Sequence, residues 1–326
     1  MDQGRRRHPR RDRTHLFPRP HGRDRRRHLS LDRERPAGLR HGERRDRDDR
    51  RPTPGRILNL SVRAVAGPDE RTLIAGFTLS AGGSKNLLIR GIGPALIPLG
   101  VPTALLDPRL QIFNSPPVAP LATNDNWGPN PTLAALFPSV GAFPLDPTGR
   151  DAALTQTFLA GNYTANVSTP GTASGVALAE VYDLDAPAAP ARLVNLSARA
   201  QVGTGADLLI AGFTLSGNVP RTVLIRGIGP GLTQFGVPNT LADPKLEVFR
   251  DTTLLHANDN WAANTTAAGT AELVAAFART GAFALPNPAS RDAALIVTLA
   301  PGNYTAQVSG VNDTTGVALI EIYELP

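Results

Sequence analysis

The sequence predicts an all-β protein: two tandem antiparallel β-sandwich domains of jelly-roll type, preceded by a disordered tail. The first observation behind this prediction is a duplication, because residues 56–61 (RILNLS) return at 192–197 (RLVNLS) and residues 88–94 (LIRGIGP) return at 224–230. The second is a hydrophobic period of two within each copy, which is typical of half-buried strands. The third is the content of turn residues, 31 glycines and 30 prolines in 326 residues, which favours short strands and tight turns.

The duplication divides the chain into four parts. Residues 1–55 are the tail, residues 56–183 are the first repeat, and residues 192–326 are the second repeat. Each repeat has a domain-sized length of about 130 residues. Residues 184–191 (LDAPAAPA) form a linker that its prolines make stiff. Since the two copies can be compared with each other, the residues that both keep are those that the unit needs.

The strands of the first repeat follow from the alternation of apolar and polar residues. In the first strand, alternation places Leu58, Leu60 and Val62 on the buried side. The expected strands cover residues 58–64, 73–79, 85–92, 109–113, 151–160, 163–168 and 176–182.

Turns and helices are expected at few places. Gly161 and Gly302 lie in the sequences AGN and PGN, which indicate tight hairpin turns between strands. Residues 133–137 and their counterparts 273–277 show the only helical pattern, which predicts one or two turns in each repeat.

The basic charge of the chain is confined to the tail. Residues 1–56 hold 20 arginines and 9 acidic residues, a net charge of +11, whereas the remaining 14 basic and 19 acidic residues give −5. With so few apolar residues the tail cannot bury a core, and we expect it to be disordered. A nucleic-acid-binding arm is the alternative interpretation. Acidic residues interrupt the arginine run and no aromatic ladder is present to stack bases, so nucleic acid is not an expected partner.

The composition of the tail also indicates an error of reading frame or of start site. Twenty arginines without a lysine are typical of a GC-rich gene read in the wrong frame. Back-translation of residues 40–45 (RHGERR), read one base later, permits the peptide GTASGV, which stands at 171–176 in the first repeat. We therefore expect a further copy of the repeat to be encoded upstream, and reading that DNA in the other frames tests this expectation.

Composition excludes several classes of function. The chain has no cysteine, so disulfides, thiolate metal sites and cysteine nucleophiles are excluded. Five of its six histidines lie in the tail and His256 has no counterpart in the first repeat, so no Ser-His-Asp set recurs. No apolar run is long enough to span a membrane, and no secretory signal is visible. We expect a protein that is not an enzyme and that has no cofactor.

The second half of each repeat resembles a known kind of module. From Asp107 and Asp243 onward, both copies read Asp-Pro-x-Leu-x-(Ile/Val)-Phe, then Asn-Asp-Asn, then Gly-Asn-Tyr-Thr-Ala-x-Val-Ser and Gly-Val-Ala-Leu. This pattern resembles the bacterial pre-peptidase C-terminal domains, which are β-sandwich modules appended to secreted enzymes and surface proteins. It is also similar to tandem repeats of large secreted proteins of environmental bacteria. The resemblance leaves out the first three strands of each repeat, and it implies an extracellular accessory module without catalytic residues.

Calcium is the one metal that the sequence suggests. The Asn-Asp-Asn loop of each repeat offers clustered oxygen ligands, which calcium prefers, and an earlier aspartate joins them if the strands bring the loops together. The alternative is that these side chains bond their own backbone in turns. The candidate ligands are Asp107, Asn124, Asp125 and Asn126 in the first repeat and Asp243, Asn258, Asp259 and Asn260 in the second.

Trp127 and Trp261 directly follow these loops and are the candidate sugar-stacking residues. An exposed aromatic ring beside a loop of variable length is typical of a carbohydrate site. The other interpretation is that each indole fixes its loop onto the core. Most other aromatic residues recur in step with the strand pattern, which indicates core positions.

Arginines and carboxylates recur together in both copies. Arg90 and Arg226 each precede a Gly-Ile-Gly-Pro turn, and an Arg-Asp pair opens a later strand in each repeat. We interpret these residues as ion pairs that tie loops to the sheet. Glu180 and Glu321, inside apolar strands, are either partners of these arginines or solvent-facing. The glycine-rich turn is not a phosphate loop, because its proline lacks an amide donor and no Lys-Ser/Thr pair follows.

Together these observations predict a non-catalytic structural or adhesive module of a secreted or cell-surface bacterial protein. Its expected partners are neighbouring domains of a longer chain. The alternative is a carbohydrate-binding accessory module, stabilised by calcium, with polysaccharide as its partner.

Overall fold

The computed structural model describes residues 52–116, 118–185, 189–263 and 269–325, so the predicted disordered tail lies almost entirely outside the described residues. The described chain is mostly antiparallel β-structure, which confirms the predicted all-β class. None of the described helices is long and apolar enough to cross a membrane.

The described residues form sixteen strands, with the same order in each repeat. The strands of the first repeat are β1 (Ile57–Ala66), β2 (Leu73–Leu79), β3 (Lys85–Ile92), β4 (Arg109–Asn114), β5 (Ala122–Asn124), β6 (Ala152–Phe158), β7 (Gly161–Ser168) and β8 (Gly175–Asp183). Those of the second are β9 (Leu193–Val202), β10 (Leu209–Leu215), β11 (Arg221–Ile228), β12 (Pro244–Arg250), β13 (Thr253–Asn258), β14 (Ala293–Leu299), β15 (Gly302–Gly310) and β16 (Gly316–Glu324).

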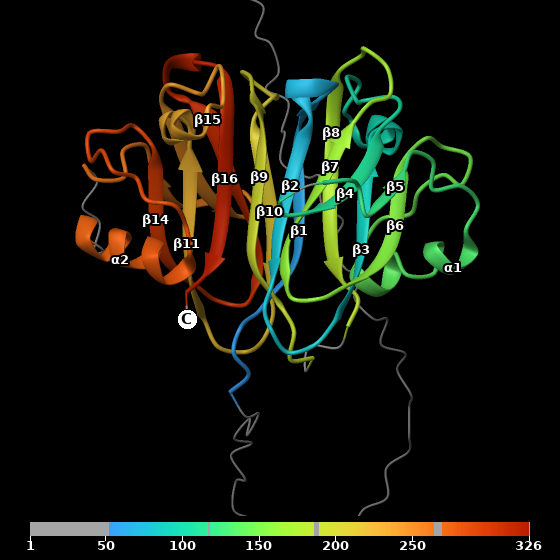
Figure 1. Ribbon diagram of the computed structural model, residues 1–326, viewed down its shortest axis with the longest axis horizontal. Coiled ribbons are helices and arrows are strands. Elements are labelled where there is room, and N and C mark those ends of the chain that lie inside the picture. The colour runs from blue at the N-terminus through green and yellow to red at the C-terminus, as the bar shows by residue number, and fades with distance from the viewer. Residues whose placement is uncertain (1–51, 117, 186–188, 264–268, 326) are drawn as a thin grey trace, which may run out of the picture.

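The strands pair across the boundary between the repeats as well as within each repeat. Strand β1 lies between β8 of its own repeat and β10 of the second, and β9 lies between β16 and β2 in the same way. The pairings form two rows of eight strands, β6-β3-β8-β1-β10-β15-β12-β13 and β14-β11-β16-β9-β2-β7-β4-β5. Two parallel bridges, at Ile57–Leu193 and Val65–Gln201, connect the rows. In Figure 1, β1, β2, β9 and β10 form the centre, flanked by the rest of the first repeat in green and of the second in orange and red.

The predicted division into two separate domains at residues 184–191 is not visible in the sheet, which is continuous from one repeat to the other. A repeat by itself leaves one edge of β1 and one edge of β2 unpaired. Unpaired edges are templates for strand addition, and here each repeat supplies the strands that the other lacks.

One core runs through both repeats. Inward-facing residues of both rows, among them Leu60, Phe77, Leu196 and Phe213, belong to a single continuous buried cluster. Removing such apolar area from water is the main stabilising contribution to the fold. The two repeats are therefore joined both by a shared hydrophobic core and by strand pairing.

The first strand departs from the predicted alternation. The sequence places Leu58 on the buried side of β1, but Ile57 is buried there and Leu58 is only half-buried. A bulge between Ile57 and Asn59, against β10, shifts the phase of the strand at its beginning.

The helices differ between the repeats. Helix α1 (Pro131–Ala134) is a single turn whose N-cap, Asn130, accepts a hydrogen bond from the amide of Leu133 at 3.0 Å. Its counterpart α2 (Thr270–Thr280) has 11 residues, which is longer than the predicted one or two turns. The second repeat has several alanines in this segment, whereas Pro138 follows α1, and this composition accounts for the difference.

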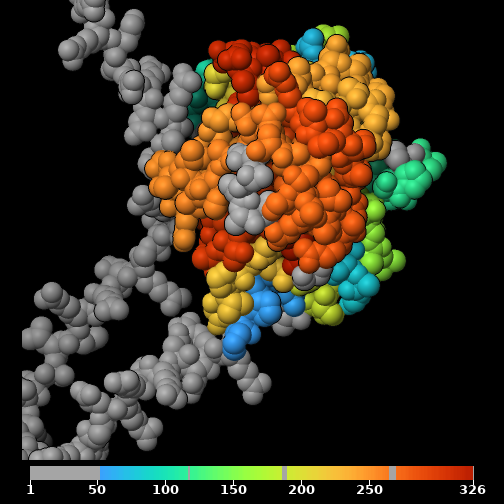
Figure 2. Space-filling model, turned by 90° about the vertical axis from the view of Figure 1, so that its left-hand side faces the viewer, coloured from blue at the N-terminus to red at the C-terminus, as the bar shows by residue number. Residues whose placement is uncertain are grey.

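Each helix belongs to a segment that covers one end of the molecule. The segments lie between β5 and β6 and between β13 and β14, and Figure 1 shows α1 and α2 at opposite ends of the long axis. Figure 2 looks onto the end formed by the second repeat. Apolar residues of these segments pack on the outer sides of β3, β6 and β8 and of β11, β14 and β16. The outer sides of the remaining strands carry no such segment among the described residues, and we call them the open faces: β9-β2-β7-β4 and β1-β10-β15-β12.

Candidate functional site

Two matching rows of residues run across the outer sides of the sheet, each from a covered half to an open face. Each row takes three members from one repeat and two from the other, over five neighbouring strands, and the residue types of the two rows are identical. The rows are Arg90–Glu180–Ser61–Gly212–Thr305 and Arg226–Glu321–Ser197–Gly76–Thr164.

The covered end of each row is a buried ion pair. The Nε of Arg90 donates to Oε2 of Glu180 at 2.8 Å, and Nη2 lies 2.5 Å from the same oxygen. The hydroxyl of Tyr182 donates to Oε1 of Glu180 at 2.7 Å, and Nη1 of Arg90 donates to the carbonyl of Phe143 at 2.6 Å. The same contacts recur in the second repeat among Arg226, Glu321, Tyr323 and Phe283. The sequence-based interpretation of these arginines as ion-pair residues is therefore correct, with the glutamates as partners.

Aromatic rings and burial make this cluster structural. The Cζ of Arg90 lies 5.0 Å from the ring centroid of Phe137 and 4.6 Å from that of Phe143, and the arginine of the second repeat is covered in the same way. Burial, and next the charge of Glu180, raise the pKa of the Tyr182 hydroxyl, so it remains a hydrogen-bond donor. Because its charges are paired and withdrawn from solvent, the cluster fastens the covering segment to the sheet.

A buried aspartate fastens the Gly-Ile-Gly-Pro turn. Oδ1 of Asp151 accepts hydrogen bonds from the amides of Gly93 at 2.7 Å and Ala95 at 3.3 Å, and Asp292 does the same in the second repeat. A Cβ at Gly93 would lie 1.8 Å from the carbonyl oxygen of Leu105, so only glycine fits there. Burial raises the pKa of Asp151, although the amide donors oppose it. The amides of this turn therefore already have an internal acceptor.

Asparagine side chains hold the Asn-Asp-Asn loops against the adjacent strand. Oδ1 of Asn124 accepts from the amide of Ala153 at 3.0 Å, and Oδ1 of Asn258 accepts from the amide of Ala294 at 3.0 Å. Nδ2 of Asn124 donates to the carbonyl of Asn126, two residues on, at 3.1 Å. The contact between Asn124 and Asn126 is of the turn type that the sequence offered as the alternative to calcium ligation, whereas the two Oδ1 contacts reach the later strands β6 and β14.

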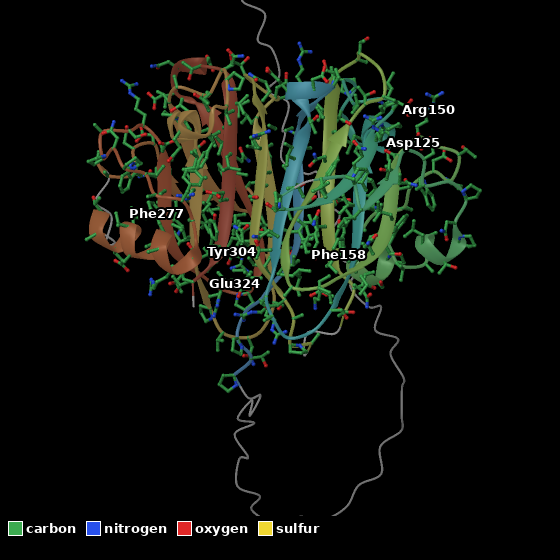
Figure 3. The ribbon with its side chains drawn as sticks, in the orientation of Figure 1. Asp125, Arg150, Phe158, Phe277, Tyr304 and Glu324 are labelled. Carbon is green, nitrogen blue, oxygen red and sulfur yellow. The ribbon has the colours of Figure 1, made fainter. Side chains whose placement is uncertain are left out.

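The aspartates of the predicted calcium site have other contacts or face solvent. Asp107 accepts from Nη1 of Arg150 at 2.9 Å, and Asp243 pairs with Arg291. Asp125 is exposed, and Figure 3 shows it with Arg150 at the upper outer edge of the first repeat. Within the described part of the chain, no three residues of the kinds His, Cys, Asp or Glu come together as a metal site. Calcium takes six to eight oxygen ligands, so the predicted site stays a prediction that a chelator tests.

The two tryptophans lie in the core. Trp127 is 6% exposed and Trp261 is 2% exposed, and their rings pack 5.4 Å from Phe137 and 5.8 Å from Phe277. The Nε1 of Trp127 donates to the carbonyl of Asp146 at 2.9 Å. A ring buried in this way offers no face to a sugar, so a carbohydrate site on this chain has to lie elsewhere.

The open faces present hydroxyl and amide groups, and sequence reasoning missed them. The first row of each open face runs across three strands as Asn195–Thr78–Asn162 and as Asn59–Thr214–Asn303. In both rows the threonine hydroxyl donates to Oδ1 of the last asparagine at 2.8 Å, which leaves the NH2 group of that asparagine for an outside acceptor. These residues are identical in the two copies at solvent-facing strand positions, and this identity was the available signal.

A groove of about 620 Å³ lies where one open face meets the covering segment of the second repeat. It is lined by Thr78 and Asn162 of the first repeat and by Asn195, Arg279 and Glu324 of the second. Figure 3 shows Glu324 toward the lower edge of the molecule. Because both repeats contribute to the lining, the groove exists only when they are combined.

No protein-family model matches the chain, and no curated protein matches it.

Proposed function

We propose that this chain is a non-catalytic structural and adhesive module of a secreted or cell-surface bacterial protein, in which two sandwich-like repeats act as one unit. The single observation that supports the proposal most is the exchange of strand pairing between the repeats. Because of this exchange, the two repeats share one hydrophobic core and do not form two separate domains joined by a linker. The resemblance of each repeat to pre-peptidase C-terminal domains supports the surface location.

The polar residues kept in both repeats also favour a structural role. The buried arginine, glutamate and tyrosine of each copy bond one another, and the buried aspartate bonds a turn. A catalytic pair needs carboxylates or bases that reach a substrate in a cleft. The retained groups are instead used to hold covering segments and turns in place.

Cooperative unfolding tests this proposal, and the chain provides its own reporters. Trp127 lies in the first repeat and Trp261 in the second, so Trp261→Phe leaves fluorescence that reports on the first repeat alone. In that background, Val248→Ala removes buried methyl groups from β12 of the second repeat. We expect the denaturant midpoint reported by Trp127 to fall with that of the whole chain, measured by circular dichroism. An unchanged Trp127 midpoint means independent domains and contradicts the proposal.

Carbohydrate binding is a second candidate function, favoured by the open faces. Their aligned hydroxyl and amide groups are the kind of donors and acceptors that hydrogen-bond a polysaccharide chain. Retention of the three-residue row in both copies supports a role other than core packing. A binding titration with immobilised polysaccharides tests it, and failure of all of them to retain the chain removes this candidate.

A further inference from the structure

The groove beside α2 is positively charged. Its lining contains Arg192, Arg221 and Arg279 but a single carboxylate, Glu324, which gives a net charge of +2. Glu324 is held by the amide of Ile57 at 2.9 Å, and it lies 3.5 Å from Nη1 of Arg192 and 3.2 Å from Nη2 of Arg221. Arg192 and Arg221 therefore share one carboxylate, and Arg279 adds a further positive charge to the lining.

Two of the arginines have donors to offer to a ligand. Arg279 is exposed at the C-terminal end of α2, and in the described part of the chain no carboxylate pairs with it. The side chain of Arg221 is 18% exposed, and its Nη2 shares the single carboxylate of Glu324 with Arg192. Guanidinium groups bind carboxylates through parallel hydrogen bonds, which suits an acidic group placed between them.

The floor of the groove offers neutral polar groups beside this charge. Thr78, Asn162 and Asn195 lie in line across β2, β7 and β9, and all three line the groove. Oδ1 of Asn162 accepts from Thr78, so its NH2 group faces an outside acceptor. A ligand that matches both features carries many hydroxyls and a negative charge.

The corresponding region of the first repeat is neutral. Arg56 and Lys85 occupy the positions of Arg192 and Arg221, and Asp183 occupies that of Glu324. Lys85 is 1% exposed and lies 2.7 Å from Asp183 and 3.7 Å from Asp185. Arg56 and Lys85 with Asp183 and Asp185 thus give no net charge there. The position of Arg279 is taken by Ser139, so the two copies differ in charge at matching places.

We propose that the groove binds an acidic polysaccharide. Its uronate carboxylate contacts Arg279 and Arg221, and its sugar hydroxyls contact Thr78, Asn162 and Asn195. This inference rests on the second candidate function, carbohydrate binding, and adds the class of sugar and the place. It requires both repeats, since the hydroxyl row comes largely from the first repeat and the charge from the second.

Isothermal titration of the full chain with a galacturonate oligosaccharide tests the proposal. The matched ligand is the same oligosaccharide with its carboxylates methyl-esterified, and free galacturonate is the small-carboxylate control. We expect the acid form to bind. The affinity of the ester should be lower by about tenfold or more, because an arginine–carboxylate pair accounts for roughly that factor. Arg279→Ser, which copies Ser139 of the first repeat, should weaken the acid form by about tenfold. Arg71→Ser changes the net charge equally at an exposed arginine outside the groove, and it should leave affinity unchanged.

The outcomes separate this inference from the function on which it rests. Equal binding of acid and ester, or an Arg279→Ser variant that folds and binds like wild type, overturns the acidic site and leaves carbohydrate binding in place. Equal affinity for free galacturonate and for the oligosaccharide overturns a polysaccharide site in favour of a small-carboxylate site. No binding of any sugar overturns both, and the structural role is then judged by the unfolding test alone.

Discussion

The two repeats agree in their buried polar contacts and differ at the ends of their sheets. The Arg–Glu–Tyr clusters match atom for atom, with equal Nε–Oε2 distances of 2.8 Å. By contrast, Lys85 with two aspartates in the first repeat corresponds to Arg221 with one glutamate in the second. The agreement marks contacts that both repeats keep, because a change to one member of a buried ion pair leaves its partner charged and unpaired. The difference also involves buried charges, since Lys85 is 1% exposed, but there the charged groups have changed together, from Lys85 with two aspartates to Arg221 with one glutamate.

Separation of the two repeats should have the largest effect on the structure. Residues 192–326 produced alone retain β9 and β10 without their partners β2 and β1. We expect this fragment to form a two-fold dimer in which each copy supplies the missing strands, because an isologous pairing closes the exposed edges. Analytical ultracentrifugation against residues 52–326 measures this. A folded monomer of the fragment contradicts the proposed dependence of one repeat on the other.

Removal of one buried charge should have the next largest effect. Arg90→Met leaves Glu180 buried without its cation, and we expect a loss of about 3–5 kcal/mol in the free energy of unfolding. Arg226→Met in the second repeat should cost a similar amount, since its contacts are the same. Denaturant titration of both variants checks this.

A double variant identifies the cause of that loss. Arg90→Met combined with Glu180→Leu removes both charges, and it should recover much of the stability that Arg90→Met loses, since a buried pair replaced by apolar side chains is often neutral. If the double variant is less stable than the single one, the glutamate stabilises the sheet through its hydrogen bonds with Ser61 of β1 and Tyr182 of β8, independently of the arginine.

Gly76, the fourth member of the row that begins at Arg226, provides a smaller test. A Cβ at Gly76 would lie 2.3 Å from Oγ of Ser197, so Gly76→Ala should cost about 1–3 kcal/mol through overpacking between β2 and β9. Because Cβ of Ser197 stands 3.7 Å away, adding Ser197→Ala should relieve most of that cost. A double-mutant cycle measured by thermal unfolding reports the coupling. Additive effects in the cycle mean that the two residues do not meet.

The alternation and the duplication were enough to predict the all-β class and most strands, because inward and outward positions follow directly from a period of two. The strand pairing between the repeats could not be predicted from the sequence. Nothing in the sequences of β1 and β10 distinguishes a partner strand in the other copy from one in the same copy. The bulge that buries Ile57 in place of Leu58 depends on that same pairing. Burial of Trp127 could not be told from exposure, because it depends on how the segment after β5 folds back over the sheet.

Loss of an asparagine contact should have a moderate effect and also tests calcium. Asn258 is buried and its Oδ1 is the acceptor of the Ala294 amide, so Asn258→Ala leaves that amide without a partner. We expect a loss of about 1–3 kcal/mol in the free energy of unfolding. If the loop holds no calcium, a chelator leaves the melting temperature of the wild type unchanged. A melting temperature that falls with chelator and recovers with added calcium supports ligation by the Asn-Asp-Asn loops.

Protonation of Asp151 gives the smallest expected effect. Burial raises the pKa of this carboxyl above its ordinary value near 4, so the folded state holds the proton more tightly than the unfolded chain. That contribution is fully present below the unfolded pKa and is lost as pH rises through the folded pKa. Asp151→Asn keeps an oxygen acceptor for the Gly93 amide but cannot ionise. The stability of wild type relative to Asp151→Asn should therefore decrease from pH 4 upward and level off above the folded pKa, in denaturant titrations across pH. If wild type instead gains relative stability over that interval, the two amide donors favour the carboxylate more than burial disfavours it.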